Sequence, residues 1–202
     1  MARQTSSVPY GYEPEDRSKS PRGTLWIYDS FESFGMQQLA PLIGMGERKS
    51  LKKLVFYPLH EETLRRMGER NAEPYYRRTE ALEELLEQAE TPLDMTIDHW
   101  EGRRKKYTPV DTAFRYLAEK YAGPHFVWVT LETANKLAGY DSFEGWIKKI
   151  RLWIDMEGSS KNREAELHPR LHAAASRWDP VDVDASEESQ QQWLESAAHP
   201  SD

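Results

Sequence analysis

The chain has 202 residues, of which 30% are charged and 38% hydrophobic, and its net charge is −7. Its mean hydropathy of −0.82 is low for a packed globule, so we expect one domain with unfolded segments. No apolar run is long enough for a membrane helix, and the polar first 23 residues predict no secretory signal. With no cysteine, disulfides, thiolate metal sites and a cysteine nucleophile are excluded, and a cytoplasmic location is expected.

The negative charge is concentrated at one end. Residues 179–202 contain seven acidic residues and no lysine or arginine, while the rest of the chain has 27 basic and 27 acidic residues. Within this acidic tail, 186–198 predicts a short helix that exposes Trp193 and Leu194, a pair suited to docking on a protein partner. The predicted division is a disordered arm (1–23), an α/β domain (24–156), a linker with a C-terminal helix (157–178) and a mostly disordered acidic tail (179–202).

Short apolar stretches alternate with helical patterns through the central part of the chain. The predicted strands are 24–29, 53–57, 94–100 and 126–130. The predicted helices are 36–45, 60–70, 75–90, 109–121, 131–137, 142–156 and 167–178. Strands separated by helical segments predict an α/β fold with three layers, a mostly parallel sheet of about four or five strands with helices on both faces, in a Rossmann-like arrangement.

Acidic residues follow the predicted strands, and the carboxyl ends of parallel strands meet at one edge of a sheet. Asp29 ends the first strand, Glu61 and Glu62 follow the second, Asp111 begins a helix after the third, and Glu132 follows the fourth. Clustered carboxylates repel one another unless a cation or a proton relieves them, and carboxylate oxygens suit Mg²⁺ or Mn²⁺. A metal held there could activate water for cleavage of a phosphodiester.

Three stretches resemble the NYN and PIN-like metal-dependent nucleases. They are 25–35 (Leu-Trp-Ile-Tyr-Asp-Ser-Phe-Glu-Ser-Phe-Gly), 109–111 (Pro-Val-Asp) and 126–132 (Phe-Val-Trp-Val-Thr-Leu-Glu), in the family's order. The resemblance implies a nuclease acting on RNA, either active or diverged and inactive, with Asp29, Asp111 and Glu132 as catalytic metal ligands. Glu132 stands where an Asp is usual, and the longer side chain would shift the metal.

A basic cluster lies beside this predicted edge. Arg103, Arg104, Lys105 and Lys106 would bind RNA phosphates as substrate-binding residues, and Tyr107 would stack on a base. A solvated surface is the alternative for the cluster.

Other interpretations stay open. Each of the three acids can instead cap a helix or favour its dipole, and then the domain is a non-catalytic binding or adaptor module for a protein partner. The order of elements is also similar to the universal stress proteins, which bind ATP through a glycine-rich turn after the fourth strand. Residues 130–135 (Thr-Leu-Glu-Thr-Ala-Asn) lack those glycines, which disfavours ATP at that turn.

Overall fold

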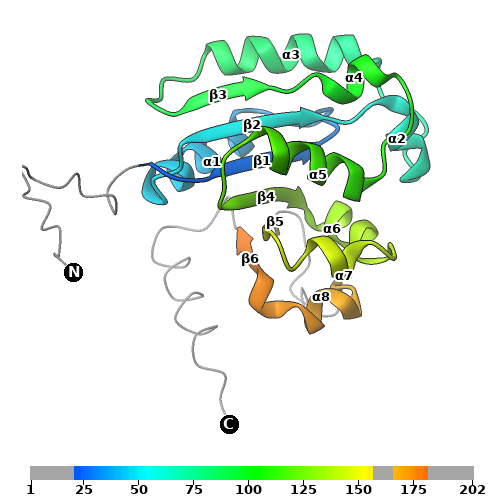
Figure 1. The fold of residues 1–202 in the computed structure, drawn as a ribbon. Coiled ribbons are helices and arrows are strands. Elements are labelled where there is room, and N and C mark those ends of the chain that lie inside the picture. Colours follow the sequence, from blue (N-terminus) through cyan, green and yellow to red (C-terminus); the bar gives the residue numbers. More distant parts are fainter. Residues whose placement is uncertain (1–20, 157–165, 182–202) are drawn as a thin grey trace, which may run out of the picture.

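The computed structural model describes residues 21–156 and 166–181. Its centre is a parallel sheet of six strands in the order β3-β2-β1-β4-β5-β6 (Figure 1). The strands are β1 (Thr24–Asp29), β2 (Lys53–Pro58), β3 (Asp94–Ile97), β4 (His125–Thr130), β5 (Arg151–Asp155) and β6 (Trp178–Val181). The predicted α/β class with a mostly parallel sheet is confirmed, with six strands where four or five were expected.

Helices cover both faces of the sheet. They are α1 (Met36–Arg48), α2 (Glu61–Arg66), α3 (Tyr75–Glu87), α4 (Trp100–Arg104), α5 (Val110–Lys120), α6 (Leu131–Ala138), α7 (Phe143–Trp146) and α8 (Pro169–Ala173), followed by the short 3-10 helix η2 (Ala175–Arg177). Among the described residues, none of these helices is both long enough and apolar enough to cross a membrane.

Successive side chains of β1 point to opposite faces of the sheet, and so they belong to two separate clusters of the hydrophobic core. Trp26 and Tyr28 pack into the cluster formed with α2, α5, α6, α7 and α8, whereas Leu25 and Ile27 pack into the cluster formed with α1 and α3. All four side chains are buried, because β1 lies between β2 and β4 and is covered on both faces. A continuous apolar run is what such a central parallel strand requires.

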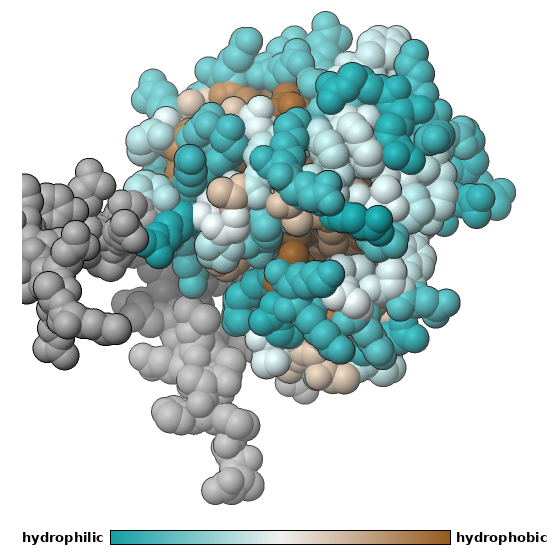
Figure 2. All heavy atoms as spheres, viewed as in Figure 1, coloured by the Kyte–Doolittle hydropathy of each residue, from teal (hydrophilic) through white to brown (hydrophobic). Residues whose placement is uncertain are grey.

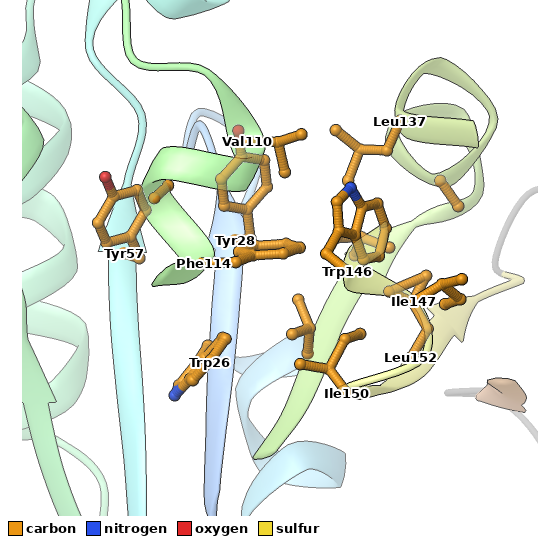
Figure 3. Packing of buried hydrophobic residues seen from close by; sticks show 14 of the residues in the cluster. Trp26, Tyr28, Tyr57, Val110, Phe114, Leu137, Trp146, Ile147, Ile150 and Leu152 are labelled. Atoms are coloured by element: carbon orange, nitrogen blue, oxygen red, sulfur yellow. The ribbon is translucent and has the colours of Figure 1, made fainter. Parts of the chain in front are cut away.

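Aromatic side chains fill the α5 side of the core. The ring of Phe114 lies 5.8 Å from that of Trp26, 5.4 Å from Tyr28 and 5.0 Å from Trp146 (Figure 3). On the outside, hydrophilic residues cover most of the face seen in Figure 2, and hydrophobic residues show only in narrow seams between them. Burial of these large rings fixes how α5 and α7 sit on the sheet.

The single helix predicted over 142–156 is wrong. The structure has α7, then a short turn, then β5, whose residues Leu152, Trp153 and Ile154 are fully buried. Trp146, Ile147 and Ile150 have helical spacing, and a short apolar run after them fits a helix or a buried strand equally well.

The segment predicted as a helix over 167–178 contains α8 and η2 and leads into β6, so the sheet extends to Val181. The predicted helix at 186–198, the acidic residues beyond Val181 and most of the N-terminal arm lie outside the described residues.

Candidate functional site

The strand order reverses between β1 and β4. From β1 the sheet grows through β2 to β3 on one side, and through β4 and β5 to β6 on the other. In an open parallel sheet, a crevice forms at such a reversal outside the carboxyl ends of the strands. At this edge β1 ends with Asp29 and β4 ends with Thr130, whose hydroxyl accepts the backbone N–H of Thr133 at 3.2 Å and caps α6.

Asp29 lies at the carboxyl end of the central strand and shapes the turn that follows. Its Oδ2 accepts the backbone N–H of Phe31 at 3.0 Å, and Phe31 adopts a φ of 63°. Burial raises the pKa of Asp29 to about 6, although hydrogen bonds from the amides of Phe31 and Ser30 oppose the rise. This carboxyl group therefore changes its charge close to neutral pH.

The other two predicted metal ligands form ion pairs within their own helices. Asp111 lies 3.8 Å from Arg115 on α5, and Glu132 lies 2.9 Å from Lys136 on α6. Among the described residues, no three His, Cys, Asp or Glu side chains are grouped as a metal site would require. The structure therefore places the three acids in separate local contacts, and Mg²⁺ or Mn²⁺ binding stays a prediction.

The acids after β2 are also engaged locally. Glu61 Oε1 accepts the backbone N–H of Tyr75 at 2.8 Å, and its Oε2 lies 3.2 Å from His60 Nε2 and 3.9 Å from Arg78 Nη2. Glu62 pairs with Arg65 on the surface.

Sequence reasoning missed a fully buried acid, Glu101, in α4. Its Oε1 accepts the backbone N–H of His60 at 3.0 Å and so ties α4 to the end of β2. Burial raises the pKa of Glu101 to about 7, against the opposing effects of the hydrogen bond from the backbone N–H of His60 and of the positive charge on Arg104. The sequence gives no signal for this role, because a glutamate beside several basic residues is usually solvated.

The predicted substrate-binding cluster is divided by the structure. Arg103, Lys105 and Lys106 are exposed, and we call these three residues the basic rim. The guanidinium of Arg104 instead stacks on the ring of Trp100, 4.6 Å from its centroid. Tyr107 is 38% exposed and lies under the guanidinium of Arg66, at 4.9 Å. The rim lies at the end of α4 and just after it, in the segment that follows β3, and therefore flanks the carboxyl edge of the sheet.

A hollow of about 300 Å³ lies between the start of α5 and the turn that joins α6 to α7. We call it the tyrosine hollow, and its lining residues are Tyr107, Pro109, Val110, Asp111, Gly139, Tyr140, Asp141 and Ser142. It shares Tyr107 with the segment that carries the basic rim. The residues of the α6–α7 turn form no sequence motif, since only the packing of this turn against α5 brings them to the site.

The opposite side of this edge is filled with aromatic rings. Phe34, just before α1, lies 5.1 Å from Phe31, 6.2 Å from Phe56 and 5.7 Å from Trp128, measured between ring centroids. Phe31, Phe56 and Trp128 are buried. A ligand at the edge therefore has room on the α5 side and little on the α1 side.

No protein-family model matches the chain, and no curated protein matches it in sequence. Among solved structures, the chain is similar to the nicotinic acid mononucleotide adenylyltransferase of Plasmodium falciparum, which was solved in complex with NaAD. The likeness covers 84% of this chain and 80% of that chain, with a TM-score of 0.56 and 8% sequence identity. It establishes a Rossmann-like α/β fold.

This comparison corrects the function predicted from the sequence. The prediction of an NYN or PIN-like nuclease is wrong: the matching fold is that of a nucleotide adenylyltransferase, and no family model supports a nuclease. The alternative of an adaptor module for a protein partner is not tested by this comparison and stays a prediction. Acids are favoured at helix starts by the helix dipole, and Asp111 and Glu132 also pair with Arg115 and Lys136. These local reasons account for the acidic pattern that was interpreted as a metal site.

Proposed function

We propose that the chain binds a nucleotide at the carboxyl edge of its sheet, on the α5 side of β1 and β4. The observation that carries this proposal is the strand order β3-β2-β1-β4-β5-β6 in an entirely parallel sheet. In the doubly wound dinucleotide-binding fold, which has this strand order, the nucleotide lies where the order reverses. The adenylyltransferase of similar fold, solved with NaAD, supports the same class of ligand.

The charges at the edge suggest how such a ligand would lie. Asp29 is anionic above about pH 6, so it would repel a phosphate group placed directly over the end of β1. The exposed cations of the basic rim offer charge-assisted hydrogen bonds to phosphate oxygens. The phosphates would therefore lie toward the rim, and the adjoining tyrosine hollow would receive a ring of the ligand.

Calorimetric titration of the full chain with ATP, AMP, NaAD and adenosine tests this proposal. We expect the phosphate-bearing ligands to bind more tightly than adenosine. Reversing two rim charges, Arg103→Glu with Lys106→Glu, should weaken ATP binding about tenfold or more, because two cations near the phosphates become anions. The matched control is Lys148→Glu with Lys149→Glu, two exposed lysines before the start of β5, at the opposite edge of the sheet.

The two variants separate a defined site from general charge attraction. Equal weakening by both pairs would mean that net charge alone draws the ligand, which would contradict a site at the rim. No binding of any of the four ligands at millimolar concentration would overturn the proposed function.

A further inference from the structure

The segment between α2 and α3 crosses the carboxyl edge of the sheet. Leu64 of α2 and Met67 just after it pack into the core cluster on the α5 side, whereas Leu82 of α3 packs into the cluster on the α1 side. The residues between the two helices must therefore pass from one face of the sheet to the other beyond the ends of the strands (Figure 1). We call residues 68–73 the strap.

The strap passes close to the end of β1. At its far end, the backbone N–H of Glu73 donates a hydrogen bond to the carboxylate of Glu32, and the carbonyl of Glu73 accepts one from Arg78 at 2.7 Å. At its near end, the strap carries Glu69. Burial, and to a smaller extent the negative charge of Glu69, raises the pKa of Asp29 at the end of β1. The strap therefore lies where the strand order reverses, which is where the nucleotide is proposed to bind.

An ion pair joins the strap to α6, the helix that follows β4. Glu69 Oε1 lies 3.6 Å from Lys136 Nζ, and the two side chains are 36% and 26% exposed. The same lysine lies 2.9 Å from Glu132, one turn earlier on its own helix. We call the pair of Glu69 and Lys136 the latch. Ion pairs as exposed as this one are weak and are screened by salt, so the latch can hold the strap and still open.

The middle of the strap has few other contacts. Arg70 and Asn71 are exposed, and their amides donate no hydrogen bond to the backbone of another described residue, while Ala72 is only partly buried against the core. Gly68 has a φ of 95°, and nothing lies within 4 Å of the position that a Cβ would take, so the backbone can turn there without a clash. Segments with an exposed backbone and little packing are the first to open locally.

We propose that the strap is a lid over the nucleotide site, that the latch keeps it closed, and that it opens to admit the ligand. This inference rests on the proposed function. The strap descends from α2 on the α5 side of the edge, which is the side where a ligand has room. When the latch breaks, Lys136 keeps Glu132 as its partner and Glu69 is released to water. Opening therefore leaves no buried charge unpaired.

Cleavage of the free full chain by trypsin after Arg70 measures how often the strap opens, because a protease needs a released segment. The substitution Lys136→Met removes the latch and leaves the sequence around Arg70 unchanged, so it should speed this cleavage several-fold. The matched control is Glu132→Gln, which removes the other partner of Lys136 and keeps the latch. This control should be cleaved no faster than the wild type. Mass spectrometry of timed digests identifies the cut after Arg70.

Stopped-flow fluorescence of the full chain with ATP that carries a methylanthraniloyl group tests the lid on the ligand side. Glu69→Gln and Glu132→Gln each remove one negative charge beside Lys136, so they change the general attraction of ATP alike. Only Glu69→Gln breaks the latch. We expect this variant to associate with the labelled ATP several-fold faster than the wild type, because more of the chains are open. Glu132→Gln should stay near the wild-type rate.

The outcomes distinguish this inference from the proposed function. Equal cleavage after Arg70 in Lys136→Met and in the wild type would overturn the latch, whether or not a nucleotide binds. Equal association rates in the two glutamine variants would overturn the lid and leave nucleotide binding standing. If no nucleotide binds to any of these chains, both the proposed function and the lid are wrong.

Discussion

Arg78 on α3 donates a hydrogen bond from Nη1 to the backbone carbonyl of Ser30, 2.6 Å away, and so joins α3 to the turn after β1. Its Nε also donates to the carbonyl of Glu73 at 2.7 Å, and its guanidinium is buried. One side chain therefore fixes the path of the chain where β1 meets the proposed site. Arg77, the preceding residue, is exposed and makes no such contact with the turn.

The substitution Arg78→Met should destabilise the fold, because methionine keeps much of the length but donates to neither carbonyl. Leaving these acceptors unpaired, with Glu61 nearby, should lower the free energy of unfolding by about 2–4 kcal/mol. Urea denaturation at 25 °C measures the change, and Arg77→Met is the matched control that should behave as the wild type. Similar losses in the two variants would contradict a specific role for Arg78.

Two glycines within helices should respond oppositely to alanine. A Cβ at Gly102 of α4 would lie 2.4 Å from Cε1 of Tyr75, whose hydroxyl contacts His99 at 3.3 Å. Displacing the Tyr75 ring should cost more free energy than the helix gains when alanine replaces glycine. We therefore expect Gly102→Ala to be destabilising by about 1–3 kcal/mol. At Gly145 of α7, a Cβ would meet nothing within 4 Å, and Gly145→Ala should be neutral or stabilising by up to about 1 kcal/mol.

Thermal and urea unfolding of these two variants provide the measurement. A Gly102→Ala variant as stable as the wild type would mean that Tyr75 moves without cost, and that the close packing of α4 against α3 contributes little.

Asp98, directly after β3, is a buried carboxylate with four donors. Its oxygens accept from the backbone N–H of Trp100, from Lys120 Nζ, and from the hydroxyls of Tyr116 and Tyr121. Burial alone would raise the pKa of Asp98, but the hydrogen bonds from Tyr121 and Lys120 outweigh it and hold the pKa below its usual value. The ionised form therefore stabilises the fold.

The substitution Asp98→Asn should lower the free energy of unfolding at pH 7 by about 2–4 kcal/mol, since Lys120 loses its partner. Because the folded pKa of Asp98 is depressed, its stabilisation is present above the usual pKa near 4 and is lost as the pH falls further. The difference in the free energy of unfolding between the variant and the wild type should therefore become smaller below about pH 4. A difference that stays constant down to pH 2 would mean that this carboxylate does not titrate with unfolding.

Much of the fold could be predicted from the sequence, because buried parallel strands are short apolar runs between helical patterns. The strand predicted at 126–130 differs from β4 by one residue. The run over 152–154 was absorbed into a helix, because Trp146, Ile147 and Ile150 before it continue the helical spacing. Local periodicity cannot locate such a boundary between helix and strand, because the boundary depends on whether the segment pairs with a neighbouring strand of the sheet.

The candidate site was less predictable, because its features come from tertiary contacts. Arg77 and Arg78 are identical neighbours in the sequence, but only Arg78 points into the molecule. Asp111 and Glu132 were singled out by their places at helix starts, which salt bridges and helix dipoles explain. Asp141, by contrast, lies in a turn without a motif and reaches the site only because that turn packs against α5.

The stability of the fold should also fall as the pH rises from about 4 to 8, because two acids have raised pKa values. Asp29 has a pKa of about 6 and Glu101 of about 7 in the folded chain, against ordinary values near 4. An acid whose pKa is raised in the folded chain contributes its full stabilisation of the fold below its unfolded pKa. This stabilisation is lost as the pH rises through the folded pKa. Each group should account for a loss on the order of 1–3 kcal/mol, since its charged form is poorly solvated.

The substitution Asp29→Asn isolates one of these contributions, because the asparagine oxygen can still accept the backbone N–H of Phe31. The variant should match the wild type near pH 4 and exceed its stability at pH 8, so that its pH profile is flatter. Urea denaturation at a series of pH values measures both profiles, and Glu101→Gln offers the same comparison at the second acid. If Asp29→Asn and the wild type show parallel profiles, the carboxyl group of Asp29 titrates alike in the folded and unfolded chains, and its burial at the end of β1 carries no cost.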